Sequence, residues 1–129
     1  MRLLLDSNVL YWAFFQGQSL TPRVRQLLED DRNDLFVSRA SIWELSAKTA
    51  RGRLAMPESS VRFLLERIEQ TGMTIIPIED AHILRTETLP HHHSDPFDRL
   101  IVAQAMEQNL TILSSDDEIP LYDVKVIWE

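Results

Sequence analysis

The chain of 129 residues contains no cysteine, and this absence excludes structural disulfides and zinc sites with thiolate ligands. No run of eighteen apolar residues occurs, so no membrane span is expected. The apolar N-terminal segment is interrupted at Asp6 and Asn8, too early for a secretory signal, and no small-residue cleavage site follows it. Together these absences predict a soluble protein of the cytoplasm.

Basic residues are in the minority, with 13 lysines and arginines against 20 acidic residues and a formal net charge of -7. This balance argues against a protein that is held on nucleic acid by bulk charge. It does not exclude a nucleic-acid enzyme whose acidic side chains are neutralised locally by metal ions. The positions of the acidic residues are therefore more informative than their number.

Internal repeats, low-complexity tracts and linkers are also missing, and the length fits a single domain spanning residues 1–129. Short apolar segments rich in Leu, Ile and Val alternate with segments of helical character, which is typical of a parallel sheet covered by helices on both faces. We therefore expect a three-layer α/β/α sandwich around a mostly parallel sheet of four to five strands. The expected strands span residues 2–6, 34–38, 73–78, 110–115 and 124–128, and the expected helices span residues 7–15, 22–30, 40–51, 57–70, 79–87 and 96–109.

Several of these helices carry recognisable start signals. Ser7 or Asn8 is expected to cap the first helix, Thr21 the second and Asp95 the last, because short polar side chains accept hydrogen bonds from free helical N–H groups. Pro57 is expected to open the fourth helix, because proline fits the first turn.

Two acidic residues fall where a parallel sheet binds its ligands, beyond the carboxyl ends of the strands: Asp6 ends the first strand and Asp116 follows the fourth. Two more lie on helices, Glu44 on the one after the second strand and Asp98 in the first turn of the one that leads into the fourth strand. Each acid also has an ordinary structural interpretation. Asp6 could cap a helix, Glu44 could pair with Lys48 four residues later, Asp98 could complement a helix dipole, and Asp116 could belong to a turn.

The four acids are more informative in combination than singly. Carboxylates held on well-packed elements at one edge of the sheet would be crowded, and both repulsion and burial disfavour their ionisation. A divalent cation relieves both penalties. Oxygen ligands suit Mg²⁺ or Mn²⁺ and do not suit zinc.

Three adjacent histidines, His91 to His93, precede the last expected helix. Neighbouring histidines in a loop cannot easily face one ion together, and an oxygen-lined Mg²⁺ site does not favour imidazole. We expect His91 and His92 to be exposed loop residues. His93 is expected to orient the loop or to touch a phosphate without binding the metal.

Four motifs occur in a fixed order between residues 3 and 119: LLLDSNVLYW, SRASIWELSAKTARGRL, HSDPFDRLIVAQA and TILSSDDEI. With them the chain resembles PIN-domain ribonucleases, and most closely the toxin subunits of VapBC-type toxin–antitoxin pairs. The third motif is the most specific match. The resemblance implies a catalytic and metal-binding quartet formed by Asp6, Glu44, Asp98 and Asp116, with Asp117 as an alternative to Asp116.

Three further residues would support this quartet. Ser7 and Ser114 stand where the family commonly has threonine, and both keep the hydroxyl that would orient a metal ligand. Asp95 matches the aspartate of the family's H-x-D-P-F-D-R pattern.

The resemblance implies a Mg²⁺-dependent endoribonuclease, with Mn²⁺ as the alternative ion, that forms a homodimer and binds a cognate antitoxin. Cationic and imidazole side chains close to the acids in sequence would contact the RNA, namely Arg39, Lys48, Arg51, Arg53, Arg99 and His93. Lys48 and Arg51 could instead complement the end of their helix, and Arg99 could pair with an acid. The aromatic residues Trp12, Phe14, Phe15 and Trp43 could receive the antitoxin or belong to the core.

Two other functions are compatible with parts of this pattern. A catalytically silent protein-binding PIN module would not need the four acids. A Mg²⁺-dependent phosphoryl-transfer domain would use Asp6 as its nucleophile, but it would favour a second aspartate close to Asp6, and the first strand supplies only one acid. The sequence does not identify the RNA that is cut.

Overall fold

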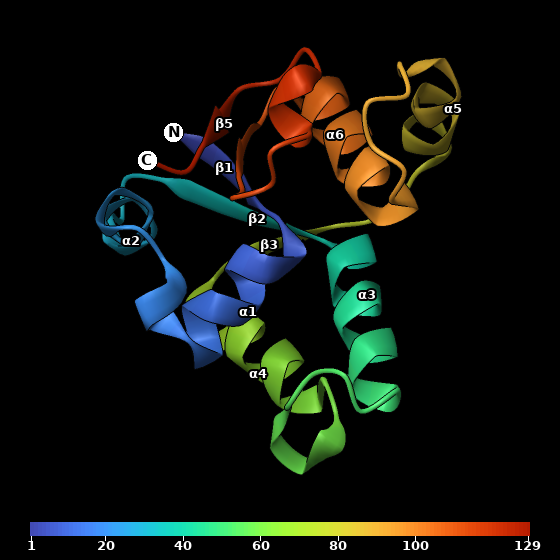
Figure 1. The fold of residues 1–129 in the computed structure, drawn as a ribbon. Coiled ribbons are helices and arrows are strands. Elements are labelled where there is room, and N and C mark those ends of the chain that lie inside the picture. Colours follow the sequence, from blue (N-terminus) through green and yellow to red (C-terminus); the bar gives the residue numbers. More distant parts are fainter.

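Five parallel strands form one sheet at the centre of the structure, a computed structural model that describes all 129 residues (Figure 1). Their order is β3-β2-β1-β4-β5, so β2 and β3 lie on one side of β1, and β4 and β5 lie on the other. The order therefore reverses beside β1, between β1 and β4. The strands are β1 (Arg2–Leu5), β2 (Asp34–Ser38), β3 (Thr74–Ile76), β4 (Thr111–Leu113) and β5 (Val126–Ile127).

Helices cover both faces of this sheet, which confirms the three-layer α/β/α architecture (Figure 1). No helix is long and apolar enough to cross a membrane. The α-helices are α1 (Ser7–Phe15), α2 (Pro22–Glu29), α3 (Arg39–Ala50), α4 (Arg62–Thr71), α5 (Asp80–Thr88) and α6 (Pro96–Gln108), and the 3-10 helices are η1 (Gly17–Ser19), η2 (Pro57–Ser59) and η3 (Ile119–Leu121).

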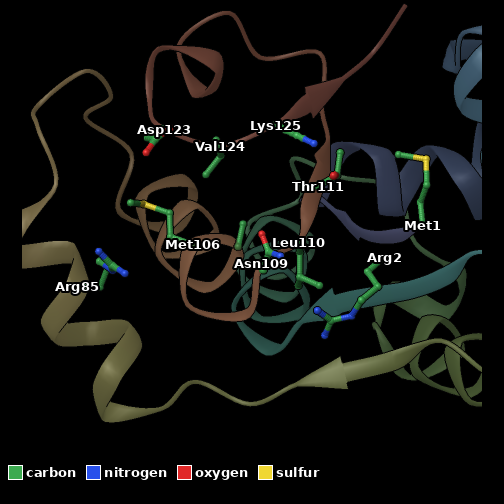
Figure 2. A pocket seen from close by; sticks show the side chains of 11 residues that line it. Met1, Arg2, Arg85, Met106, Asn109, Leu110, Thr111, Asp123, Val124 and Lys125 are labelled. Atoms are coloured by element: carbon green, nitrogen blue, oxygen red, sulfur yellow. The ribbon is translucent and has the colours of Figure 1, made fainter.

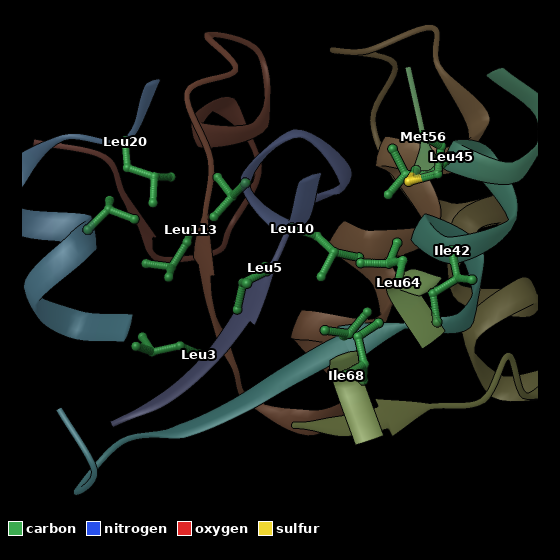
Figure 3. Close-up of a cluster of buried hydrophobic side chains, with 13 residues drawn as sticks. Leu3, Leu5, Leu10, Leu20, Ile42, Leu45, Met56, Leu64, Ile68 and Leu113 are labelled. Carbon is green, nitrogen blue, oxygen red and sulfur yellow. The ribbon is translucent and has the colours of Figure 1, made fainter. Parts of the chain in front are cut away.

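Strand β1 is buried on both faces because its side chains alternate between two hydrophobic clusters. Leu3 and Leu5 pack with residues of α1, α2 and α4 in the first cluster (Figure 3). Leu4 points the other way and packs with α6 in the second cluster. All three leucines are fully buried, and each burial contributes about 1.5–3 kcal/mol. This two-sided burial explains why β1 is an uninterrupted apolar run rather than an alternating one.

One expected helix begins later than the sequence indicates. Helix α4 starts five residues after Pro57, and the intervening segment forms the short helix η2. Glu58 and Ser59 have positive φ values of 54° and 52°, which interrupt the helical hydrogen bonds. Proline fits the first turn of a 3-10 helix as well as that of an α-helix, so Pro57 does not distinguish them. The buried side chains of α4, Leu64 and Ile68, lie beyond the break.

The helix caps agree with expectation at two positions and differ at a third. Thr21 and Asp95 cap α2 and α6, as predicted. Helix α1 is capped by Asp6 and not by Ser7 or Asn8. The reason is that α1 begins directly behind β1, so Asp6 itself has the extended backbone of a cap, with φ -74° and ψ 174°.

Candidate functional site

Asp6 lies where the strand order reverses, at the carboxyl end of β1. Its Oδ1 accepts a hydrogen bond of 2.8 Å from the N–H of Val9 and thereby caps α1. Its Oδ2 accepts a hydrogen bond from the hydroxyl of Ser114, which follows the neighbouring strand β4. Asp6 is only 4% exposed, and these two contacts fix the orientation of its carboxylate.

Glu44 reaches the same edge of the sheet from α3, which follows β2. Its Oε1 accepts a hydrogen bond of 2.9 Å from the hydroxyl of Ser7, and its Oε2 lies 2.8 Å from Nζ of Lys48. The ion pair with Lys48 that the helical spacing predicts is therefore present. The Glu44 side chain is 8% exposed, whereas that of Lys48 is 41% exposed, so the ammonium group remains accessible to solvent.

Asp98 lies in the first turn of α6, three residues after its cap. The Asp95 side chain accepts a hydrogen bond of 2.8 Å from the N–H of Phe97, and Pro96 occupies the start of the helix. This start places the Asp98 side chain, 15% exposed, beside the His93 ring.

His93 joins two of the acids. Its Nε2 lies 3.0 Å from Oδ2 of Asp98 and 3.0 Å from Oδ2 of Asp116. Its Nδ1 accepts a hydrogen bond of 3.1 Å from the N–H of Asp95. In the neutral ring the proton must therefore lie on Nε2, which makes His93 a donor to the carboxylates. His93 lies in a loop, as the sequence predicts, but its side chain is only 10% exposed and reaches further into the acidic site than its position in the sequence indicates.

The structure distinguishes the two adjacent aspartates after β4. Oδ1 of Asp116 accepts hydrogen bonds from the N–H groups of Glu118 and Ile119, at 2.7 and 3.1 Å, which leaves its Oδ2 for His93. Asp117 is exposed and is not among the residues that line the site. His91 and His92 are exposed, as predicted.

The acids together enclose a cavity of about 310 Å³ without any hydrophobic lining. One ligand atom from each of His93, Asp98 and Asp116 lies within 4.8 Å of the others. Because the atom of His93 is the protonated Nε2, the two carboxylates are the members of this group that can face an ion. The cavity is lined by Asp6, Ser7, Asn8, Glu44, Lys48, His93, Asp95, Asp98, Ser115 and Asp116.

Crowding perturbs the pKa values of these groups. Burial, assisted by the charges of Asp95 and Glu44, raises the pKa of Asp98 to about 7 against the opposing effect of His93. Burial likewise raises the pKa of Asp6 to about 6, although its hydrogen bond with Ser114 lowers it. Both shifts reflect the cost of burying the ionised carboxylates, which a divalent cation would relieve.

The pKa values of His93 and Asp116 shift in the directions that favour the charged form of each group. Burial is the largest single effect and opposes the charge of each. Their mutual hydrogen bond outweighs it only together with the N–H groups that Asp116 accepts and the negative charges around His93, so that the pKa of Asp116 is lowered and that of His93 is raised. Protonation of His93 at Nδ1 would cost the hydrogen bond from the Asp95 N–H, which acts against this rise.

A larger cavity, of about 800 Å³, lies at the opposite edge of the sheet, beside the start of β1 and β4 (Figure 2). It contains no cluster of carboxylates. Two of its cationic groups are already engaged, because Arg85 contacts Glu107 at 2.9 Å and Arg2 donates to the carbonyl of Gln108 at 2.7 Å. The acidic cavity is therefore the stronger candidate for chemistry.

Arg99 does not form the ion pair with an acid that its sequence position allows. Its guanidinium donates to the carbonyls of Pro90 and Thr86, at 2.9 and 2.8 Å, and to the hydroxyl of Tyr122 at 3.2 Å. These partners are neutral, so there is no ion pair with an acid. They engage both terminal nitrogens of the guanidinium, so the predicted contact of Arg99 with RNA would have to use its Nε–H or replace one of these hydrogen bonds.

The remaining cationic candidates surround α3. Arg39 at its start and Arg51 and Arg53 behind its end are all exposed. None of the three lines the acidic cavity. Lys48 is the one cationic candidate of this helix that reaches the acids.

Sequence comparison relates the chain to proteins of known family. A model of the PIN domain matches residues 3–125. Ribonuclease VapC22 of Mycobacterium tuberculosis is 33% identical over 117 residues, covering 88% of this chain and 86% of that protein. Ribonuclease VapC16 of the same organism is 31% identical over 58 residues, covering 45% of this chain and 41% of that protein.

The fold is also found among solved structures. A chain of the VapBC2 complex from Rickettsia felis, bound to a DNA fragment from its promoter, superposes with a TM-score of 0.74. The two chains share 16% sequence identity, and each is covered over 100% of its length. At this identity the comparison shows a common fold.

Proposed function

Because the chain belongs to the PIN-domain family, we propose that it is a metal-dependent endoribonuclease and the toxin of a VapBC-type toxin–antitoxin pair. The observation that carries this proposal is the convergence of four acids around one cavity, Asp6, Glu44, Asp98 and Asp116. The ribonuclease names of two relatives and the fold shared with a VapBC complex support it.

The donor set fits Mg²⁺ or Mn²⁺, because it consists of carboxylate oxygens without thiolates and its one imidazole carries its proton toward the acids. We expect Asp6 and Asp98 to bind the ion directly, and Glu44 and Asp116 to complete the site directly or through water. When bound, such an ion lowers the pKa of a coordinated water and offsets the charge that develops on the leaving oxygen.

Residues beside the acids hold them in place for this task. Ser114 and Ser7 donate hydrogen bonds to Asp6 and Glu44, so each serine hydroxyl orients one carboxylate. Asp95 starts the helix that carries Asp98, and its negative charge helps to raise the pKa of Asp98. A cation near Asp98 would relieve this repulsion.

The RNA backbone would meet the cationic side chains around α3. Lys48 is the best placed, since it lines the cavity and is 41% exposed. A phosphate that approaches the acids would contact its ammonium group, while Arg39, Arg51 and Arg53 are exposed for flanking phosphates.

We further propose a cognate antitoxin as partner and a homodimeric assembly. Of the aromatic residues considered for the antitoxin groove, Trp12, Phe14 and Phe15 pack partly buried against the first hydrophobic cluster. Trp43 is 64% exposed and meets the Phe97 ring edge-on at 5.4 Å. It is therefore the aromatic residue on α3 that remains available to a partner.

Cleavage of RNA by the purified chain tests the proposal. Asp6→Asn and Asp98→Asn should abolish cleavage, and chelation with EDTA should abolish it until Mg²⁺ or Mn²⁺ is added back. Asp117→Asn is the matched control, because Asp117 is exposed and does not line the cavity; it should cleave like the unmodified chain.

Two outcomes would favour other functions. A phosphoaspartate trapped on Asp6 would indicate phosphoryl transfer. RNA left intact with either ion, together with retained binding of the antitoxin, would indicate a catalytically silent module.

A further inference from the structure

The hydroxyl of Tyr122 accepts hydrogen bonds from three N–H groups. It accepts hydrogen bonds from the backbone N–H groups of His92 and His93, at 3.2 and 2.9 Å, and from Nη1 of Arg99 at 3.2 Å. Tyr122 is 5% exposed and belongs to the second hydrophobic cluster. A phenol oxygen has two lone pairs, so three donors use its accepting capacity fully.

Arg99 extends this contact to the chain on the other side of the histidine loop. Its guanidinium also donates to the carbonyls of Pro90 and Thr86. The segment between α5 and α6 is therefore tied at its beginning by Arg99 and at its end by Tyr122. The ring of His92 adds an edge-on contact with the Tyr122 ring at 5.0 Å.

The loop held in this way places the side chain of His93 beside the acids. The backbone of His93 is fixed by Tyr122, and its Nδ1 is fixed by the N–H of Asp95. These two contacts leave Nε2–H aimed at Asp98 and Asp116, 3.0 Å from an oxygen of each. The orientation of the two carboxylates thus depends on a histidine that is held from outside the acidic cavity.

We propose that Tyr122 is a positioning residue of the catalytic site, which acts by anchoring the backbone of His93 so that its Nε2–H orients Asp98 and Asp116. This inference rests on the proposed function, since those two acids are among the proposed metal ligands. Tyr122 does not line the cavity, and its hydroxyl contacts neither acid. Its effect must therefore pass through His93.

Tyr122→Phe tests this role because it removes the hydroxyl and keeps the buried ring. The chain contains one other tyrosine, Tyr11, whose hydroxyl donates to the carbonyl of Ala55 at 2.8 Å and which does not line the acidic cavity. Tyr11→Phe is therefore a matched control for the loss of one hydroxyl.

The first readout is the tautomer of His93 in the metal-free chain at a pH high enough for the ring to be neutral, measured by long-range ¹H–¹⁵N NMR and assigned by its disappearance in His93→Asn. The unmodified chain and Tyr11→Phe should show the proton on Nε2. Tyr122→Phe should show a mixture of tautomers or exchange broadening, because the loop loses the acceptor of two N–H groups.

The second readout is Mn²⁺ affinity, measured by calorimetry. Tyr122→Phe should bind Mn²⁺ about tenfold more weakly, as loss of an outer hydrogen-bond partner does in other metal sites, and Tyr11→Phe should bind like the unmodified chain. Cleavage by Tyr122→Phe should show a lower kcat at an unchanged KM, since Tyr122 is buried and does not line the cavity that RNA would enter.

An unchanged His93 tautomer and unchanged Mn²⁺ affinity in a folded Tyr122→Phe protein would overturn the proposal. If that variant fails to fold, Arg99→Lys provides a second test, because it removes the guanidinium that binds Pro90, Thr86 and Tyr122 but leaves the Tyr122 hydroxyl to accept from the His93 N–H. The proton should then stay on Nε2 of His93; a mixture of tautomers in Arg99→Lys would show that Arg99, and not the Tyr122 hydroxyl, anchors the loop and would overturn the proposal. If the unmodified chain binds no Mn²⁺, the proposed function fails, and the tautomer measurement still decides whether Tyr122 positions His93.

Discussion

Replacement of Asp98 by asparagine should stabilise the metal-free protein above neutral pH. Asp98 has a pKa of about 7 in the folded chain, raised from 3.8 chiefly by burial. Between these two values the native state keeps a proton that the unfolded chain has released, so stability falls as pH rises from about 4 to 7. Asparagine cannot ionise, and Asp98→Asn therefore lacks this loss.

The size of the effect follows from the same shift. A tenfold change in an ionisation constant is worth about 1.4 kcal/mol, so the rise of the Asp98 pKa from 3.8 to about 7 corresponds to about 4 kcal/mol at pH 8. Relaxation and water penetration screen part of this cost, and we expect about 2–4 kcal/mol. For a chain of this length each kcal/mol moves Tm by about 4 °C.

Urea unfolding of the metal-free chain at pH 8 and at pH 4 measures this difference. Asp98→Asn should be more stable than the unmodified chain at pH 8, and the gap should close toward pH 4. Asp117→Asn, at an exposed position, should show no such pH-dependent gain. The reasoning would be refuted if Asp98→Asn were no more stable than the unmodified chain at pH 8. It would also be refuted if the difference in stability persisted at pH 4, because ionisation of the buried Asp98 could then not be its cause.

Four shorter predictions concern the same region. Mg²⁺ or Mn²⁺ at a hundred times its Kd should stabilise the unmodified chain by about 2.7 kcal/mol in a thermal-shift assay, and Asp98→Ala should lose this gain. Ser114→Ala should raise the pKa of Asp6 further by removing its hydrogen bond, so that the acidic limb of the pH–rate profile moves to higher pH. Lys48→Ala should raise KM for RNA without weakening Mn²⁺ binding measured by calorimetry. Leu113→Ala should cost about 2–5 kcal/mol in urea unfolding, because Leu113 is fully buried in the first cluster.

The layer architecture could be predicted from the sequence because a strand buried on both faces has no polar positions. The run Leu3 to Leu5 has this property, and the structure buries all three side chains on alternating faces. The order of the strands could not be predicted in the same way, since it depends on contacts between segments far apart in the chain. That order decides which strand ends lie side by side, here those that lead to Asp6 and Ser114.

The sequence-based predictions were wrong or incomplete where the local residue types do not indicate the structure that forms. Positive φ values commonly fall on glycine, but at the break before α4 they fall on Glu58 and Ser59, so the break could not be seen. Tyr122 lies 29 residues from His93, and no periodicity joins the two. Arg99 stands beside a proposed metal ligand in sequence, yet its helical position turns its guanidinium toward the carbonyls of the preceding loop.

The ordinary and the functional interpretations of each acid turn out not to exclude one another, because a carboxylate has two oxygens. Asp6 uses Oδ1 to cap α1, and its Oδ2 meets the serine hydroxyl that follows β4. Asp116 uses Oδ1 to close a turn, and its Oδ2 meets His93. Glu44 pairs with Lys48, as an ordinary helix residue would, while the same carboxylate lines the cavity.

The structural contact of each acid therefore fixes the direction in which its second oxygen points. An enzyme that must hold several carboxylates close together before any cation arrives needs such anchors, since repulsion alone would turn the side chains away from one another. The residues that make the anchors are backbone N–H groups, serines and one histidine, all of which donate hydrogen bonds. Donors favour the charged form that a metal ion requires, and the helix caps and turns of this fold thus prepare its proposed chemistry.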